Sequence, residues 1–227
     1  MTKSMTKTDV QLQRDVIDEL RWDPAVGPSE IGVAARDGVV TLTGAVHSIA
    51  MKFAAIHAAE RVAGVKALAE DLVVELPSNF KRSDTEIAHA ALAALKWHVE
   101  VPSERVRARV DDGWIVLDGE LDWEFQRSAA ANAVRSLTGV RGVTNNLTLK
   151  PHAFAPDVRD RIQSAIKRSA EVDSKRISVE AMDGRVILRG TVRSWAERQD
   201  AERAAWSAPG VTAVDDQIAI RVPVTAA

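Results

Sequence analysis

The sequence predicts an α+β protein of three tandem αββαβ domains, each with two helices packed on one face of a three-stranded mixed sheet. Two observations lead to this prediction. An Asp-Gly pair occurs three times at spacings of 75 and 71 residues, and two more glycines follow each pair at fixed offsets. Such landmarks in three copies indicate an internal repeat. The pairs are Asp37-Gly38, Asp112-Gly113 and Asp183-Gly184, and the later glycines are Gly44 and Gly64, Gly119 and Gly139, and Gly190 and Gly210.

The repeat divides the 227-residue chain into three domains. We expect them over residues 8–77, 83–150 and 156–223. Each spans about 70 residues, which is small for a domain that folds on its own.

A helix is expected to open each domain. Apolar residues recur at i, i+4 and i+8, a spacing that places them on one helix face. Thr8-x-x-Gln11 and Ser83-x-x-Glu86 are capping-box patterns that mark the start of this helix in the first two copies. The apolar positions are Leu12, Val16 and Leu20, then Ile87, Ala91 and Leu95, then Val158, Ile162 and Ile166.

Two strands should follow as a hairpin, because a type I′ turn requires positive φ angles that glycine and aspartate tolerate. The first strands are expected around 31–35, 106–110 and 177–181, and the second strands over 39–43, 114–118 and 185–189. A repeated glycine ends each second strand. We interpret Gly44, Gly119 and Gly190 as structural glycines, where the backbone bends or closely approaches a neighbour.

The second helix of each copy presents a row of small residues, mostly alanine, which allows it to lie close to the sheet. Its expected N-caps are Ser48, Asp122 and Ser194. A right-handed crossover then leads to a third strand that pairs with the second one in parallel. These strands are expected over 65–76, 140–149 and 211–222.

Composition excludes several classes of function. The chain has no cysteine, so disulfides, thiolate metal sites and a cysteine nucleophile are absent. The net charge of −2 argues against a nucleic-acid partner. The five histidines show no HxxxH or HExxH spacing, and no GxSxG or GxxxxGK[ST] motif occurs. We therefore expect no catalytic residues, no metal and no cofactor.

The ends of the chain and its apolar runs bear on location. No apolar run approaches the ~18 residues of a transmembrane helix, so no transmembrane segment is expected. The first residues, MTKSMTK, are not followed by the apolar region of a secretory signal peptide. We therefore expect the protein in the cytoplasm.

The tryptophans and one row of arginines are the candidate contact residues. Trp22 and Trp97 hold matching places near the end of the first helix, and we expect them to cover the small cores. Trp123 and Trp195 stand at the start of the second helix and are candidates for lipid or partner contact. Arg185, Arg189 and Arg193 alternate along the third copy, which suggests a cationic sheet face. The alternative interpretation is an ordinary solvated face.

Short motifs in all three copies carry a family resemblance. The first copy contains Ile31-x-Val33, Asp37-Gly38-Val39-Val40-Thr41-Leu42-Thr43-Gly44-x-Val46 and Gly64-Val65-x-x-Leu68. The central motif returns as Asp112-Gly113-Trp114-Ile115-Val116-Leu117-Asp118-Gly119-x-Leu121 and as Asp183-Gly184-Arg185-Val186-Ile187-Leu188-Arg189-Gly190-x-Val192. This pattern resembles the BON domain, a module named for bacterial osmotically inducible and nodulation proteins. The resemblance covers nearly the whole chain.

The resemblance implies an αββαβ fold, no enzymatic activity and attachment to membranes or envelope components, with phospholipid binding as the usual suggestion. The family members that this chain resembles are periplasmic proteins of osmotic stress. The leading hypothesis is therefore a non-enzymatic stress adaptor that binds an anionic phospholipid surface or an envelope protein. The alternative is a homo-oligomeric or protein–protein scaffold without lipid binding, which would self-associate through a sheet face or an exposed strand edge.

Overall fold

The computed structural model describes residues 7–27, 30–151, 157–168 and 176–221. Residues 156 and 223, the expected ends of the third domain, lie outside these ranges. The described chain forms three αββαβ units in sequence, each with a mixed three-stranded sheet, so the predicted fold class is confirmed.

Each unit has the same order of elements. The first comprises α1 (Asp9–Trp22), β1 (Ile31–Arg36), β2 (Val39–Val46), α2 (Ile49–Arg61) and β3 (Ala67–Val74). The second comprises α3 (Asp84–Trp97), β4 (Val106–Asp111), β5 (Trp114–Leu121), α4 (Glu124–Arg135) and β6 (Gly142–Leu149). The third comprises α5 (Val158–Arg168), β7 (Ile177–Met182), β8 (Arg185–Val192), α6 (Trp195–Trp206) and β9 (Ala213–Ile220).

The second strand lies at the centre of every sheet. It pairs antiparallel with the first strand and parallel with the third, so that Val40 lies opposite Ala35 on one side and Leu68 on the other. The hairpins turn at the Asp-Gly pairs, where Asp37 has a φ of 54° and Gly38 a φ of 85°. The parallel pairing confirms the crossover through the second helix.

The first helix buries its predicted apolar stripe, which is Leu12, Val16 and Leu20 in α1. Both predicted capping boxes form. In α1, the Thr8 hydroxyl accepts a hydrogen bond from the Gln11 N–H at 3.3 Å, and the Gln11 side chain accepts one from the Thr8 N–H at 3.0 Å. Two of the backbone N–H groups that a helix start leaves without partners are thereby satisfied.

The second helix packs on the sheet through small residues, and Ala55, Ala58 and Ala59 of α2 are fully buried. Ser48 caps α2 as predicted, but the prediction of Asp122 as the cap of α4 is wrong. Trp123 holds the cap position there. The Gln126 side chain accepts hydrogen bonds from the N–H groups of Asp122 and Trp123, and the Asp122 carboxylate pairs instead with Arg105.

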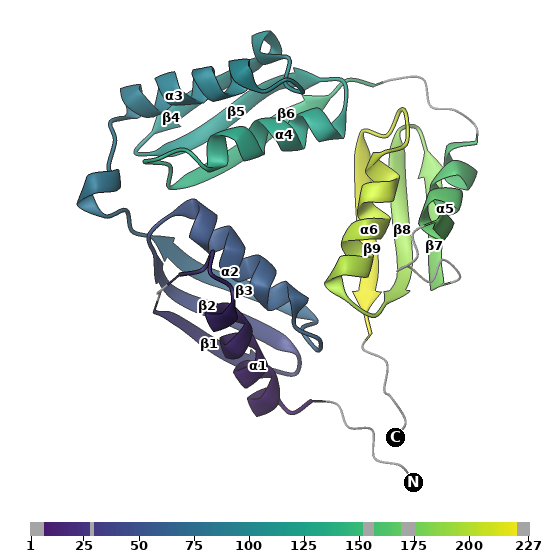
Figure 1. Ribbon diagram of the computed structural model, residues 1–227. Helices are drawn as coiled ribbons and strands as arrows, with labels where there is room; N and C mark the ends of the chain where they lie inside the picture. The colour runs from purple at the N-terminus through teal and green to yellow at the C-terminus, as the bar shows by residue number, and fades with distance from the viewer. Residues whose placement is uncertain (1–6, 28–29, 152–156, 169–175, 222–227) are drawn as a thin grey trace.

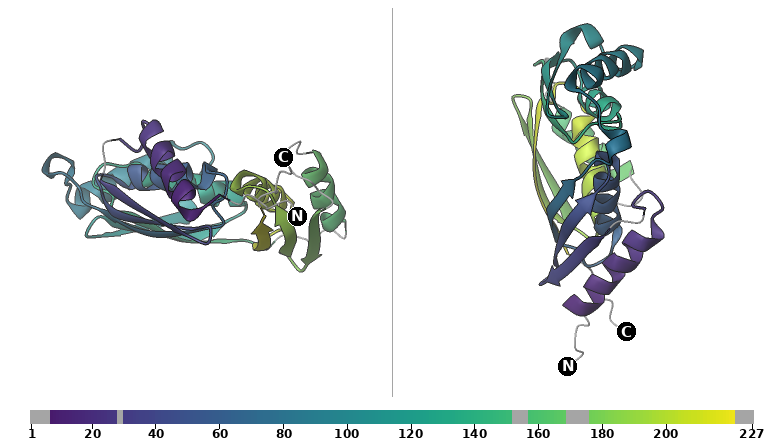
Figure 2. Two further views of the ribbon diagram at one scale, coloured as in Figure 1. Left: turned by 90° about the horizontal axis from the view of Figure 1, so that it is seen from below. Right: turned by 90° about the vertical axis from the view of Figure 1, so that its left-hand side faces the viewer.

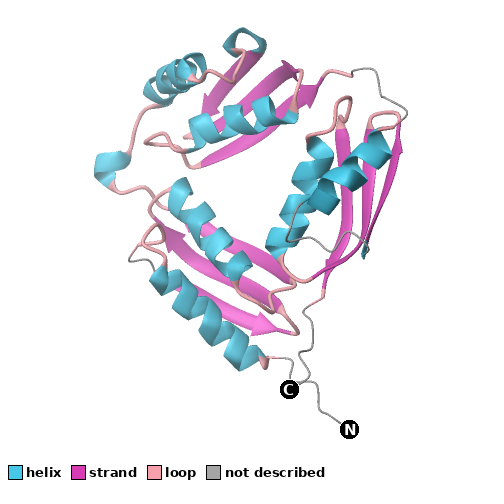
Figure 3. Ribbon diagram, turned by 45° about the vertical axis from the view of Figure 1, so that its right-hand side comes forward, coloured by secondary structure: helices cyan, strands magenta, loops and turns pink. Residues whose placement is uncertain are grey.

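The three domains lie at the corners of a triangle (Figure 1; Figure 3). Helices α2, α4 and α6 face its centre, whereas α1, α3 and α5 lie toward the outside. In every domain the helices cover the same side of the triangle, so the three uncovered sheet faces point in one common direction (Figure 2). None of the helices in the described ranges is long and apolar enough to cross a membrane.

Candidate functional site

The uncovered sheet faces expose large apolar side chains. Alternate residues of a strand point to opposite faces, and the outward positions include Val39 and Val73 in the first domain. Trp114 lies outward in the second domain and is 48% exposed, and Met182 lies outward in the third and is 73% exposed. We call the three uncovered sheet faces together the platform. Each domain contributes at least one apolar side chain to it.

Trp114 lies across the platform. Its ring crosses the neighbouring strand at Gly142, where an added Cβ would come within 2.3 Å of the indole. The indole N–H donates a hydrogen bond to the Thr144 hydroxyl at 2.8 Å. These contacts hold the ring in place while almost half of its surface stays accessible.

The predicted arginine row is divided by the structure. Arg185 and Arg189 lie on the platform, where Arg185 pairs with Asp215 at 2.8 Å and Arg189 with Glu180. Arg193 follows the end of β8, and its guanidinium lies 3.8 Å from the carboxylate of Glu197 in α6. Because every one of these cations has an acidic partner, the row contributes little net positive charge.

The expectation that Trp22 and Trp97 cover the cores is wrong. The two side chains are 82% and 87% exposed. Each is the last residue of its helix and stands two positions beyond the buried stripe, which turns it about 200° away from the core. Leu20 and Val26 fill the corresponding end of the first core instead.

The inward-facing helices meet head to tail around the triangle. The Arg135 guanidinium of α4 lies 3.9 Å from the ring centroid of Phe53 in α2. The Arg127 guanidinium of α4 lies 4.9 Å from the ring of Trp206 in α6. A long hydrogen bond of 3.5 Å joins the Gln199 side chain of α6 to the Glu60 carboxylate of α2. The three contacts close the triangle.

These contacts use equivalent positions of the repeat. Counted from the first residue of its helix, the fifth position is occupied by Phe53, Ser128 and Gln199, and the twelfth by Glu60, Arg135 and Trp206. At each corner the twelfth position of one helix meets the fourth or fifth position of the next. The arrangement is therefore a closed ring of heterologous contacts within one chain.

Trp195 and Trp123, the two tryptophans proposed from sequence, lie between domains. Trp195 begins α6 and packs against the buried residues of its own domain and against the joint core of the first two domains. Its indole nitrogen is buried without a hydrogen-bond partner in the described residues. Trp123 lines a groove between the second and third domains. The structure brings neither of them together with the platform arginines.

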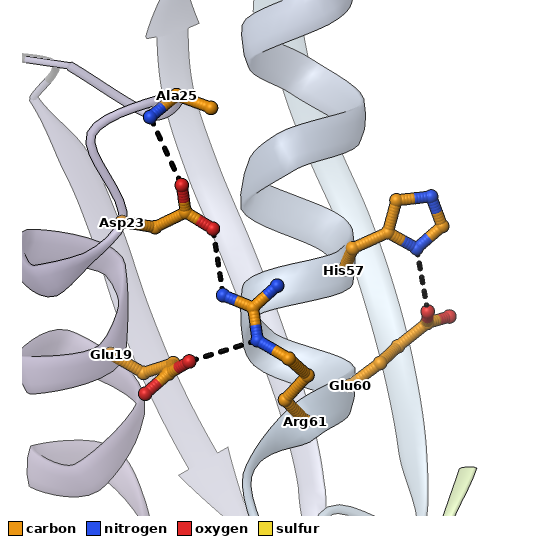
Figure 4. A network of polar contacts seen from close by, with 6 residues as sticks. All are labelled: Glu19, Asp23, Ala25, His57, Glu60 and Arg61. Carbon is orange, nitrogen blue, oxygen red and sulfur yellow. Dashed lines mark hydrogen bonds and ion pairs between the residues drawn. The ribbon is translucent and has the colours of Figure 1, made fainter. Parts of the chain in front are cut away.

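A polar network ties the two helices of the first domain together (Figure 4). Arg61 at the end of α2 donates to Glu19 at 2.9 Å and to Asp23 at 2.7 Å. The hydrogen bond from Arg61, supported by the Ala25 N–H, holds the pKa of the Asp23 carboxyl below its usual range. The same bonds raise the pKa of Arg61. Arg61, Glu19 and Asp23 therefore have structural partners within the first domain, and His57 lies 3.0 Å from the Glu60 carboxylate in the same view.

The described residues contain no cluster of side chains suited to a metal ion, since no three of their histidine, aspartate or glutamate side chains gather to hold one. The contact residues Phe53, Arg135 and Trp206, and the platform residue Trp114, were not identified from sequence. Their positions recur in the repeat but their residue types do not. Gly142, which pairs opposite Trp114, is the sequence feature that leaves room for the indole ring.

A family model matches most of the chain. The model of the BON domain matches residues 8–75, 83–151 and 155–222. Osmotically-inducible protein Y of Escherichia coli (strain K12) is 27% identical over 143 residues, which are 60% of this chain and 71% of that protein. The C-terminal domain of CdsD, the structural protein of the type III secretion system of Chlamydia trachomatis, covers 95% of this chain and 100% of its own, with 13% identity and a TM-score of 0.26. The PrgH periplasmic domain covers 90% and 99%, with 13% identity and a TM-score of 0.22.

Proposed function

We propose a function from the premise that the chain belongs to the BON domain family. In this proposal the protein is a non-enzymatic, stress-related adaptor that docks on an anionic phospholipid surface through its platform. The similarity to an osmotically inducible protein supports the role in stress. The observation that carries the docking proposal is the common direction of the three uncovered sheet faces.

The platform suits a flat lipid surface. Three faces that point the same way can contact a bilayer together, and each carries an exposed apolar side chain. Tryptophan is favoured at the boundary between lipid and water because its ring is apolar and its N–H is polar. Trp114 therefore serves as the central anchor in this proposal.

Charge adds little to the attraction. The chain carries a net charge of −2, and Arg185 and Arg189 are neutralised by their partners. Docking should therefore be weak and rest on apolar contact, with only a shallow dependence on salt.

Vesicle co-sedimentation tests the proposal. The full chain is mixed with phosphatidylglycerol–phosphatidylcholine vesicles at low salt, alongside the variants Trp114→Ala and Trp97→Ala. Trp97 is also highly exposed but lies at the end of α3, on the helix side of the triangle, so it is the matched control. We expect Trp114→Ala to reduce pelleting several-fold and Trp97→Ala to leave it unchanged. Equal effects of the two changes, or no pelleting of the parent chain, would overturn the proposal.

The alternative function is a scaffold that self-associates or binds an envelope protein without lipid. The strand order leaves β1 and β3, and their equivalents, at the sheet edges, where a further strand could pair. Light scattering over a range of concentrations tests self-association directly. A mass that rises with concentration, together with absence of vesicle binding, would favour the scaffold.

The cytoplasm is the compartment that we propose, in keeping with the sequence-based expectation. Fractionation of cells that express the full-length gene with a C-terminal epitope tag tests it. Recovery in the periplasmic fraction would contradict it.

A further inference from the structure

The groove between the second and third domains has the size of a binding site. It encloses about 1090 Å³ where the start of α4 faces the second half of α6. Ligand pockets measure roughly 300–1,000 Å³ and often lie between domains. The groove belongs to the helix side of the triangle and is separate from the platform.

Carboxylates dominate the charge of the groove. Glu100, Glu124 and Glu202 line it together with Arg203. Glu124 pairs with Arg127 at 2.6 Å and Arg203 pairs with Asp200 at 2.8 Å, so both of these charges are compensated. Glu100 is exposed and makes no hydrogen bond or ion pair within the described ranges. Glu100 and Glu202 therefore supply the net negative charge of the groove and attract a positively charged partner.

Aromatic rings form its apolar surface. Trp123 and Phe125 are 37% and 54% exposed, and Trp206 lies on the opposite wall. The Arg127 guanidinium already lies over the ring of Trp206, so this wall accepts a planar cation within the protein itself. Cation–π contacts of this kind contribute more when they are partly shielded from water.

Amide and hydroxyl side chains complete the lining. Asn132 and Gln199 stand on opposite walls, with Ser128 and Ser207 beside them. The Asn132 oxygen accepts a bond from Arg135, which leaves its amide nitrogen to donate. Gln199 uses its nitrogen toward Glu60, which leaves its oxygen to accept. One donor and one acceptor facing across a groove can pair with the N–H and C=O groups of an extended chain.

We propose that this groove binds an extended basic peptide segment. Its lysine or arginine side chains would lie near Glu100 and Glu202, and its apolar side chains against Trp123 and Phe125. The volume exceeds that of a small organic cation and suits a segment of several residues. Because the two walls belong to different domains, a bound segment would also hold these domains together.

Fluorescence anisotropy with a labelled probe tests the proposal on the full chain. The probe is the peptide Ala-Arg-Leu-Lys-Ala-Arg-Phe, and its counterpart replaces every basic residue with glutamate. We expect the basic peptide to bind and the acidic one to bind at least about tenfold more weakly. The double variant Glu100→Gln/Glu202→Gln should weaken the basic peptide about tenfold. Glutamine at 202 can still accept the hydrogen bond from the Trp206 indole, so the fold should be kept.

Matched controls separate the groove from the rest of the surface. Glu120→Gln removes an exposed carboxylate from the platform, and we expect it to leave peptide binding unchanged. Trp123→Ala should weaken binding, whereas Trp97→Ala should not, and thermal melting checks that each variant is folded. Equal binding of the two peptides, or an equal loss from Glu120→Gln, would overturn the proposal. Binding of the tetramethylammonium ion without binding of the peptide would overturn it too. Vesicle binding reports on the platform, so the two proposals fail independently.

Discussion

The guanidinium of Arg135 lies over the ring of Phe53, at 3.9 Å from its centroid, and joins the second domain to the first. The Nε atom of Arg135 is buried without a hydrogen-bond partner among the described residues, and burial lowers the pKa of this guanidinium. The ring face therefore compensates part of the hydration that this half-buried cation has lost. The twelfth position of one helix and the fourth or fifth position of the next also make the other two contacts between domains, with different chemistry.

Removal of the ring should loosen this corner. We expect Phe53→Ala to lose about 0.5–2 kcal/mol of contact energy, because the half-buried guanidinium of Arg135 loses the ring that covers it. Small-angle scattering should show a larger radius of gyration, and the segment between the first two domains should become easier to cleave. Val10→Ala, an exposed change in α1, is the control. Scattering curves of the two variants that superimpose would contradict this expectation.

A side chain at Gly119 should unfold the second domain. An added Cβ would lie 2.1 Å from the carbonyl oxygen of Arg105, and the φ angle of 147° is unfavourable for other residues. We expect Gly119→Val to cost about 3 kcal/mol or more, which is most of the stability of a domain this small. Limited proteolysis with mass spectrometry should find cleavage within residues 83–150. Glu120→Ala, at the next position, should leave the second domain resistant.

The three domains should also fold separately. Each has its own capped helix, hairpin and crossover, so fragments 8–77, 83–150 and 156–223 should each show mixed α/β circular dichroism. The buried residues of the third domain form a core of their own, whereas those of the first two form one continuous cluster. We therefore expect the third fragment to lose the least stability on separation. An unstructured third fragment would contradict this order.

The pKa of Asp23 predicts an acid-dependent loss of stability in the first domain. Because this pKa is lower in the folded protein than in the unfolded chain, the stabilisation is present above the unfolded value of about 3.9. It is lost as the pH falls through the folded value. Asp23→Asn should therefore lower the melting temperature at pH 7, and the difference from the parent should shrink below about pH 4.

An exposed aspartate provides the control for this experiment. Asp37→Asn removes a carboxylate that lies 3.9 Å from the neighbouring Arg36 in the first hairpin, and asparagine tolerates the turn conformation. We expect its melting temperature to follow that of the parent at every pH. A constant difference between Asp23→Asn and the parent from pH 7 to pH 2 would show that the carboxylate charge is not responsible.

Release of a platform arginine should strengthen vesicle binding. In Asp215→Asn the Arg185 guanidinium loses its ionic partner and faces the lipid with its full charge. One cation near an anionic surface contributes about 1 kcal/mol, which corresponds to roughly fivefold in affinity. Asp18→Asn makes the same change in net charge on the helix side, at an exposed position of α1. Equal gains from both variants would show that net charge, and not the platform, determines binding.

The repeat made the fold of each domain predictable. Local rules decide the position of a capping box, an Asp-Gly hairpin or an apolar stripe, and the three copies confirm one another. Two expectations that rest on matching positions in the copies are wrong. Trp22 and Trp97 share a place near the end of the first helix, but this place lies off the apolar stripe. Asp122 corresponds to the caps Ser48 and Ser194, but the Gln126 side chain satisfies this helix start from within the helix.

The contacts between domains could not be predicted in this way. Phe53, Ser128 and Gln199 share a helix position but no chemistry, so a search for repeated residues passes over them. The partners of Arg185 and Arg189 come from neighbouring strands of the same sheet. These partners can be identified only once the strand register is known. The register places Glu180 and Asp215 opposite Ile187, which lies between Arg185 and Arg189 on the same face of the sheet. The two carboxylates therefore lie beside the two arginines.

The unlike chemistry at equivalent helix positions has a consequence for the order of the domains. In a chain with the first two domains exchanged, Trp206 would meet Lys52 and Phe53, Arg135 would meet Gln199, and Glu60 would meet Arg127 and Ser128. None of the three present pairings would survive, although each domain could still fold. The order of the three copies therefore determines which residues meet at the corners of the triangle, and a gene that exchanged two copies would encode the same domains joined by three different pairs of residues.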